Sequence, residues 1–154
     1  VTHEEVTSEE LGGASTHSSK SGVTHFTAAN EIDCIGQLKE LLSYIPQNCE
    51  EDAPVIAYDS KDEARVALND IIPANPNQPY DMREVIEGLT DKDSFFEVHK
   101  DFAENIVVGF ARIDGRSVGI VANQPAYLAG VLDINSSTKG ALPHSTSTWI
   151  TSKE

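Results

Sequence analysis

The clearest pattern of hydrophobic positions lies in the second half of the chain. Ile106–Ile113 and Val118–Ala122 are two runs rich in β-branched residues, which is typical of strands covered on both faces. An Asp-Gly pair at 114–115 separates them and favours a two-residue hairpin turn, because glycine readily adopts a positive φ. Gly109 and Gly119 fall at comparable places in the two runs, where we expect close approach of another backbone. The pattern predicts an antiparallel hairpin.

A helical pattern dominates the first third of the chain. Asn30 is a favourable N-cap, and Glu31 and Asp33 fall in the first turn, where acidic side chains interact well with the helix dipole. We expect Pro46 to end this helix. Its apolar residues recur at helical spacing and form one face that we expect to lie in the core: Ile32, Ile35, Leu38, Leu41, Leu42 and Ile45.

Shorter elements precede this helix. Thr7 and Glu10 have the spacing of a capping box, which predicts a helix running toward His17. The glycine pair at 12–13 interrupts it, either as a helix break or as a place where backbone approaches a ligand. His25–Thr27 is predicted to be a short strand.

The segment from Pro46 to Pro79 is predicted to be a connection. Residues 47–58 are acidic and without period, and residues 73–79 are rich in proline, which disfavours regular helix and central strand. Between these stretches, Lys61–Asn69 has a pattern compatible with one or two helical turns. A second helix follows from Tyr80-Asp81, and then a strand at Phe95-Phe96. The apolar face of that helix comprises Met82, Val85, Ile86 and Leu89.

The C-terminal part changes character. The second strand of the hairpin is predicted to stop at residues 123–125, and a helix should follow Asp133 with Asn135 or Ser136 as its cap. Pro143 is expected to break that helix almost as it starts. Residues 142–154 have no apolar period.

The chain is strongly acidic. Its 154 residues carry a formal charge of −14, with only 11 lysines and arginines. Nucleic acids and anionic membranes are polyanions, so neither is expected as a partner. The sequence holds no apolar run long enough for a membrane span, and its first residues lack the pattern of a signal peptide.

Motifs of side-chain catalysis and metal binding are missing from the sequence. It contains no GxSxG, HExxH or P-loop. Cys34 falls in the helical pattern and Cys49 in a polar loop, so we expect one buried and one surface thiol and no metal site. His17 has no carboxylate or nucleophile at a partnering distance in sequence, so we expect a structural or orienting role for it.

The stretch ENIVVGFARIDGRSVGIVANQP at 104–125, followed by AGVLDINSSTKGA at 129–141, closely resembles a known family. It is similar to the carboxyltransferase (β) subunit of biotin-dependent acyl-CoA carboxylases, nearest to propionyl-CoA carboxylase. The stretch VTHEEVTSEELGGASTHSSKSGVTH at 1–25 resembles the family segment that closes the first of two halves. The resemblance covers about residues 1–141, which is a fragment of the family's length.

The resemblance implies an α/β fold of the crotonase type (ClpP/crotonase superfamily), with the end of the first half joined to the start of the second. Residues 1–45 would close the N-terminal carboxyltransferase domain and residues 46–79 would connect the halves. Residues 80–141 would open the C-terminal domain, and residues 142–154 would be an unrelated tail.

The implied activity is transfer of CO2 from carboxybiotin to propionyl-CoA, which gives methylmalonyl-CoA. Biotin would be carried on a partner subunit or domain, and ATP would be used only at the partner biotin carboxylase. The implied partners are an acyl-CoA, the biotin carboxylase/biotin carrier subunit and further copies in a ring-shaped oligomer of dimers. The implied compartment is the bacterial cytoplasm or the mitochondrial matrix.

No catalytic residue is carried over from the family, because its two oxyanion holes lie outside the matched region. The fragment is therefore expected to be inactive alone. Two sets of residues are expected to support the substrate site by resemblance. The first-half set is Gly12, Gly13, His17 and Gly22, and the second-half set is Asn123, Gln124, Pro125 and Gly130.

Other functions stay open from the sequence. Within the family, the chain could come from a methylmalonyl-CoA decarboxylase or from an acetyl-CoA-preferring carboxylase. Outside catalysis, it could be a truncated product, a binding module that joins intact subunits, or an independent acidic binding domain.

Overall fold

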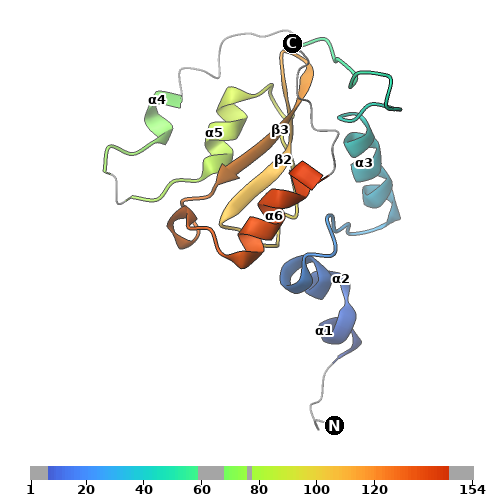
Figure 1. The fold of residues 1–154 in the computed structure, drawn as a ribbon, viewed down its shortest axis with the longest axis vertical. Coiled ribbons are helices and arrows are strands. Elements are labelled where there is room, and N and C mark those ends of the chain that lie inside the picture. Colours follow the sequence, from blue (N-terminus) through green and yellow to red (C-terminus); the bar gives the residue numbers. More distant parts are fainter. Residues whose placement is uncertain (1–6, 59–67, 76–77, 146–154) are drawn as a thin grey trace.

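A computed structural model describes residues 7–58, 68–75 and 78–145 (Figure 1). In chain order the elements are α1 (Ser8–Gly12), α2 (Ala14–Thr16), the π-helical turn η1 (His17–Ser21), α3 (Glu31–Leu42), α4 (Leu68–Ile71), α5 (Met82–Leu89), β1 (Phe96–Val98), β2 (Ile106–Ile113), β3 (Arg116–Asn123), the 3-10 turn η2 (Leu128–Gly130) and α6 (Ile134–Ser145).

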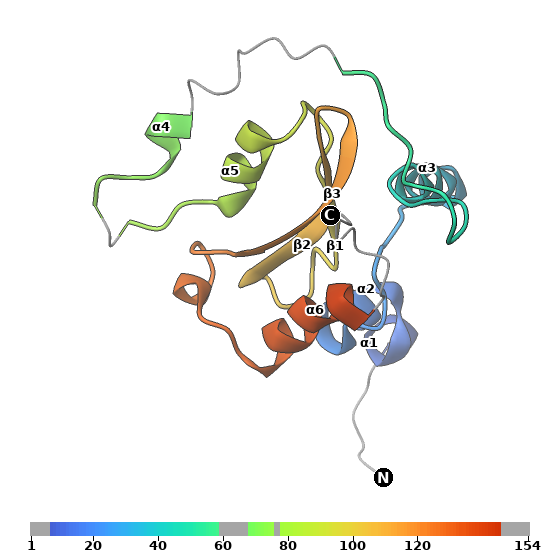
Figure 2. The ribbon, with the colours of Figure 1, turned by 45° about the horizontal axis from the view of Figure 1, so that its top comes forward.

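A three-stranded antiparallel sheet in the order β1-β2-β3 forms the centre of the fold. Ile106 pairs with Asn123 and Ile113 with Arg116, so the predicted hairpin is confirmed. Both α5 and α6 pack on β2, on opposite sides of the sheet in Figures 1 and 2. Burial of a Val or Ile side chain contributes about 2 kcal/mol, and Val107 and Val108 are buried almost completely. The core therefore lies along β2.

The hairpin turn has the predicted geometry. Asp114 and Gly115 have φ values of 52° and 75°, which is the type I′ turn that matches strand twist. The Asp91 carboxylate accepts hydrogen bonds from both backbone N–H groups, at 2.9 and 2.7 Å. Asp91 thus satisfies the donors that the turn leaves unpaired.

The predicted close approach of another backbone is confirmed at Gly109. A Cβ on Gly109 would lie 2.5 Å from the carbonyl oxygen of Phe96 on the neighbouring strand. Coverage of both faces is confirmed for β2, whose residues are buried up to Arg112, but it is wrong for β3. β3 is at the edge of the sheet, and its residues alternate between partly covered and exposed from Val118 onward.

The N-terminal elements follow the predicted breaks. Thr7 and Glu10 exchange hydrogen bonds as a capping box, with Thr7 N to Glu10 Oε2 at 2.9 Å and Glu10 N to Thr7 Oγ1 at 3.2 Å. The bond from the Thr7 backbone lowers the pKa of the Glu10 carboxyl. α1 ends at Gly12, and Gly13 has an extended backbone between the two helices.

α3 has the predicted start but not the predicted burial. The Asn30 side chain caps the Asp33 N–H at 3.0 Å. The helix ends at Leu42, before Pro46. The prediction that its apolar face lies in the core is wrong for this chain, because no residue of α3 is buried. Cys34 is exposed as well, so its prediction as a buried thiol is also wrong.

One further prediction is wrong, one is confirmed and one lies mostly outside the described residues. His25–Thr27 does not form a strand, because its backbone carbonyls make isolated hydrogen bonds to two different segments. His25 O accepts from His99 N at 3.0 Å, and Thr27 O accepts from Gln37 Nε2 at 2.9 Å. Residues 47–58 form no regular element, as predicted, and they attach to the hairpin turn through Ile56 N and Gly115 O. Of Lys61–Asn69, only the last two residues lie in the described part, at the start of α4.

α5 and β1 occur where the sequence predicts them, and α6 differs. Its cap is Asp133, whose carboxylate accepts from Ser136 N at 2.8 Å while Ser136 Oγ accepts from Asp133 N at 2.7 Å. The helix continues through Pro143 to Ser145. The expected break is wrong because Pro143 lies beyond two full turns that are already anchored on β2. Residues 146–154 of the predicted tail lie outside the described part.

The segment before the connection is attached to the sheet through a joint at the end of α3. The Tyr44 hydroxyl donates to Ser94 O at 2.6 Å. Arg112 on β2 donates through Nη2 to Ser43 O and Oγ, at 3.0 and 2.7 Å, and its guanidinium lies 3.9 Å from the centre of the Tyr44 ring. We call these four residues, Ser43, Tyr44, Ser94 and Arg112, the joint.

Candidate functional site

The second-half set of predicted site residues gathers where β3 ends. Asn123 Nδ2 donates to Gly130 O at 2.9 Å, which folds η2 back on the strand. Gly130 is buried and has a φ of 70°, a conformation that glycine adopts without the strain of a Cβ. The loop between β3 and α6 is therefore held by side-chain contacts of the strand itself.

Gln124 is completely buried, and both ends of its carboxamide are hydrogen-bonded inside the protein. Its Oε1 accepts from Met82 N at 3.0 Å, and its Nε2 donates to Asp81 Oδ1 at 2.6 Å. These bonds tie the end of β3 to the N-terminus of α5. Pro125 directly follows and is partly exposed. Because the Gln124 carboxamide is occupied, it positions backbone and does not face a ligand.

Acidic and basic groups lie next to the Gln124 side chain. Burial acts to raise the pKa of Asp81, but hydrogen bonds from Arg83 N and Gln124 outweigh it, and the pKa is lowered. Arg83 binds the Glu97 carboxylate through Nε and Nη2, at 2.8 and 2.9 Å. That pair raises the pKa of Arg83. The result is a charged network linking α5 to β1.

The loop after Gln124 has unusual backbone geometry. Leu128, Ala129 and Gly130 have successive φ values of 47°, 52° and 70°. Non-glycine residues in this region are strained by of order 1 kcal/mol or more, and such strain persists only where neighbours fix it. Here Asn105 holds the loop. Its side-chain Nδ2 donates to Val131 O at 2.7 Å, and its backbone carbonyl accepts from Gln124 N at 2.9 Å.

The first-half set forms a separate group. His17 is exposed; its Nδ1 lies 3.3 Å from Ser21 Oγ, and its Nε2 lies 3.7 Å from the position of a Cβ on Gly12. Gly13 separates α1 from α2. Gly22 has a φ of 62°, and a Cβ there would come within 2.7 Å of the Phe102 ring. Gly22 thus lets the first segment pack on the loop before β2.

The structure does not bring the two sets together. In Figures 1 and 2, α1 and α2 lie on one side of α6 and the η2 loop on the other. The roles of both sets toward a substrate therefore stay a prediction.

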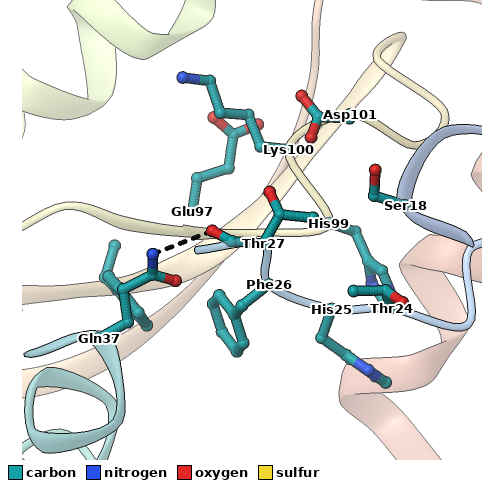
Figure 3. A pocket seen from close by; sticks show the side chains of 11 residues that line it. Ser18, Thr24, His25, Phe26, Thr27, Gln37, Glu97, His99, Lys100 and Asp101 are labelled. Carbon is teal, nitrogen blue, oxygen red and sulfur yellow. Dashed lines mark hydrogen bonds between the residues drawn. The ribbon is translucent and has the colours of Figure 1, made fainter. Parts of the chain in front are cut away.

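A polar cleft occurs instead where the first segment meets β1 (Figure 3). It has a volume of about 330 Å³. One wall is residues 24–27 with Ser18 and Gln37, and the other is residues 96–97 and 99–101. The cleft is therefore built from both of the segments that the sequence assigns to different halves.

Two histidines pack against each other in this cleft. The ring centres of His25 and His99 are 4.1 Å apart. Burial lowers the pKa of His99 and proximity to His25 adds to the effect, whereas a hydrogen bond with the Gly22 backbone opposes it. His99 Nε2 is buried and has no hydrogen-bond partner among the described residues. A neutral His99 is compatible with this setting, whereas a doubly protonated ring pair would be repulsive.

Sequence reasoning missed Lys139. Its side chain is completely buried on α6, and its Nζ donates to Phe102 O at 2.8 Å and to Ala103 O at 3.4 Å. Burial lowers its pKa from 10.5 to about 8. Ser136 and Lys139 are one helical turn apart and both fully buried. Their spacing does not signal this burial, because polar side chains at i, i+3 are also common on exposed helix faces.

The described residues hold neither a metal-binding cluster nor a membrane-spanning helix. No group of three or more His, Cys, Asp or Glu side chains there could hold a metal ion. In the same part of the chain, every helix is too short or too polar to cross a membrane.

Comparison with known proteins identifies the family. The family described as the carboxyl transferase domain matches residues 1–143. The carboxyltransferase subunit of propionyl-CoA carboxylase from Haloferax mediterranei is 54% identical over 142 residues. The methylmalonyl-CoA decarboxylase subunit alpha from Veillonella parvula is 51% identical over 142 residues. Each alignment covers 92% of this chain, and the chain spans only 28% of the length of these relatives.

A solved structure gives the same result. Transcarboxylase 12S, described as a hexamer with methylmalonyl-coenzyme A and methylmalonic acid bound, superimposes with a TM-score of 0.85 at 44% identity. The superposition covers 92% of this chain and 27% of that one. That protein is a crotonase-fold carboxyltransferase, which confirms the predicted fold class. Over residues 1–143, this chain belongs to the carboxyl transferase domain family.

Proposed function

We propose that this chain is part of a carboxyltransferase subunit that moves CO2 from carboxybiotin to propionyl-CoA and is inactive alone. The observation that carries this proposal is the 54% identity to a propionyl-CoA carboxylase subunit over nearly the whole chain. The alignment covers 92% of the chain, so it includes the hairpin and α5.

The proposed reaction is a transfer between two carbonyl systems. The N–CO2 bond of carboxybiotin breaks, a C–CO2 bond forms at the α-carbon of propionyl-CoA, and the α-proton passes to the released biotin nitrogen. Enolates develop on both partners, and preorganised N–H donors stabilise such oxyanions best. No side-chain base is needed from this chain. The biotin would arrive on a partner subunit or domain, with ATP used only at the biotin carboxylase.

The contribution of this chain is support of the substrate walls. Asn123 uses its carboxamide to hold the loop after β3, and Gln124 uses its carboxamide to tie the end of β3 to the N-terminus of α5. Gly22 lets the first segment pack on the loop before β2. We infer that they place backbone for a cleft completed by the rest of the subunit. Ring-shaped oligomers of such subunits, in a bacterial cytoplasm or a mitochondrial matrix, belong to the same proposal.

A graft tests the proposal. Residues 1–143 replace the matching region in the Haloferax mediterranei subunit, which is then assayed with its own partner subunits. We expect carboxylation of propionyl-CoA within about tenfold of the parent, because core positions that differ conservatively cost little. The 154-residue chain alone should give no transfer. Turnover by the isolated chain, or an assembled but inactive graft, would contradict the proposal.

A second candidate function is methylmalonyl-CoA decarboxylation. The 51% identity to the Veillonella parvula subunit favours it nearly as well. To separate the two candidates, residues 1–143 also replace the matching region of the Veillonella parvula subunit. A segment that functions only in a carboxylase should give no decarboxylation there. A truncated product or binding module would assemble with subunits while adding no activity.

A further inference from the structure

His99 directly follows β1 and is held there by the first segment of the chain. Its backbone has a φ of 55°, in the left-handed region that histidine visits more readily than most residues. Its N–H donates to His25 O at 3.0 Å, and its carbonyl accepts from Phe102 N at 3.1 Å. His99 is only 3% exposed. The contact with residue 25 therefore helps to fix a buried histidine in a backbone conformation that few neighbours would impose.

The first segment also covers the His99 side chain (Figure 3). The His25 ring is exposed, and its centre lies 4.1 Å from the centre of the His99 ring, with the planes inclined at 33°. The next residue, Phe26, stacks on Phe96 of β1 at 5.0 Å. Residues 22–27 thus close over β1 and the start of the loop that leads to β2.

Only one nitrogen of the His99 ring is hydrogen-bonded in the described part of the chain. Nε2 is buried and has no partner among the described residues, so the bond with the Gly22 backbone involves Nδ1. That bond acts to raise the pKa of His99, which identifies the ring as the donor. A neutral imidazole with its proton on Nδ1 has a bare acceptor at Nε2. The next proton must therefore enter at Nε2, where the described residues offer no acceptor.

Two other elements bring basic groups to His99. Burial lowers the pKa of His99 most, and His25 on the first segment and Lys139 on α6 lower it further, against the opposing bond with Gly22. Lys139 has a pKa of about 8, so it carries its charge throughout the range below pH 7. A protonated His99 would therefore add a buried charge beside a lysine and a second imidazole.

The carboxylates near His99 do not offset that charge. The Glu97 carboxylate on β1 is bound by Arg83 at 2.8 and 2.9 Å. Asp101 is exposed, and so is Lys100 between it and His99; exposed charges interact weakly because water screens them. Carboxyl groups also titrate near about pH 4, below the range in which histidine changes charge.

We propose that His25 and His99 form an acid-sensitive latch between the two segments of the chain. At neutral pH the latch holds residues 22–27 over β1. A proton from solvent that binds His99 Nε2 releases residues 22–27 and opens the polar cleft of about 330 Å³ that the two segments enclose. The inference goes beyond the proposed function and does not depend on carboxyl transfer.

The direction of the pH dependence follows from where the proton is accepted. In the open form His99 meets water and titrates near its ordinary pKa of about 6.5, whereas the closed form takes up the proton only at lower pH. Above that pH both forms are neutral at His99, and the balance between them is constant. As the pH falls below it, the open form binds more protons and becomes more populated.

Hydrogen exchange of the His99 amide tests the latch, because that N–H donates across it to His25 O. Exchange of the 154-residue chain is followed by NMR at pH 7 and pH 5.5, and protection factors are taken relative to unstructured peptide at the same pH. Amides of β2 are the internal reference. We expect the ratio of His99 to β2 protection to fall several-fold, with a ceiling of about eightfold, because an open histidine is about nine-tenths protonated at pH 5.5.

Two variants assign the effect to His99. His99→Asn removes the titrating ring and keeps a residue type that tolerates a positive φ, so its protection ratio should be the same at both pH values. His17→Gln is the matched control, because His17 is an exposed histidine of the same segment, and this variant should keep the fall. An unchanged ratio in the parent chain, or an equal fall in His99→Asn, would overturn the proposal.

A second measurement on the parent chain decides the matter if the His99→Asn chain does not close. The ring signals of His99 are followed by NMR from pH 8 to pH 5, together with the nuclear Overhauser effect between the His25 and His99 rings, which are 4.1 Å apart. The His99 ring should titrate below about 6.5, and the ring contact should disappear over the same range. Titration at the ordinary value, or a ring contact that survives protonation, would contradict the latch.

Discussion

Lys139 is the residue whose environment departs most from what its type predicts. Buried lysines are rare because the charged form loses hydration. Here the Nζ is held by two carbonyl groups of the loop at Phe102 and Ala103, with no carboxylate bonded to it among the described residues. The lysine attaches α6 to the loop that precedes β2. Its lowered pKa of about 8 is the consequence of that burial.

This shift predicts a pH dependence of stability. Between pH 8 and 10.5 the unfolded chain keeps a proton on Lys139 that the folded chain has lost, so the free energy of unfolding rises with pH. Below pH 8 both states are protonated, and the contribution is constant. From pH 7.5 to 9 the rise should be about 1 kcal/mol. Urea unfolding followed by circular dichroism measures it.

Two variants test whether Lys139 is the group whose titration changes the free energy of unfolding. Lys139→Met should lose the rise between pH 7.5 and 9, whereas Lys100→Met, at an exposed lysine of the same region, should keep it. Equal pH profiles for the two variants would show that Lys139 is not the titrating group.

At the scale of elements, the hairpin shows a turn that only glycine fits. Gly115 has a φ of 75°, and a Cβ there would clash with the Ile56 carbonyl oxygen of the connection. Gly115→Ala should lower the free energy of unfolding by about 2 kcal/mol or more, because strain and clash add. Gly36→Ala is the matched control. Gly36 lies in α3 with open space around its Cβ position, so this change should stabilise by about 0.5–1 kcal/mol.

The measurement is thermal or urea unfolding of both variants beside the parent chain. Similar losses for the two changes would mean that glycine in general, and not this turn, sets stability.

The same elements show what local sequence can predict. The Asp-Gly turn, the Thr7–Glu10 capping box and the Asn30 cap are determined by residues within a few positions of each other, and all three form as predicted. Both ends of α6 differ from the prediction. Its start is a local feature that the sequence prediction missed, since Asp133 and Ser136 exchange hydrogen bonds across three positions. Its C-terminal end is not local, because the passage through Pro143 depends on packing against β2.

Features that depend on residues far apart in the sequence could not be predicted from local patterns. Gln124 was singled out by resemblance alone, and its bonds to Asp81 and Met82 join residues more than forty positions apart. No local pattern contains that information. The burial of α3 was predicted from a helical pattern of apolar residues that is physically sound, but no residue of α3 is buried in the described part of the chain.

At the scale of the whole molecule, α3 and the sheet differ in how firmly they are held. β2 is buried along nearly its whole length, whereas α3 has no buried residue and is attached through the joint at its C-terminal end. Local opening costs least where few apolar contacts are lost. We therefore expect α3 amides to exchange with solvent well before those of β2.

Hydrogen exchange with mass spectrometry tests this order and the role of the joint. Tyr44→Phe removes the hydroxyl that donates to Ser94 O at 2.6 Å. Loss of one buried hydrogen bond costs about 1–2 kcal/mol, so exchange in α3 should become roughly tenfold faster while β2 is unchanged. Tyr127→Phe, at an exposed tyrosine, is the control and should alter neither. Exchange of α3 and β2 at one common rate would instead indicate a single cooperative unit, as expected of an independent binding domain, and would count against a chain built to be completed by the rest of a larger subunit.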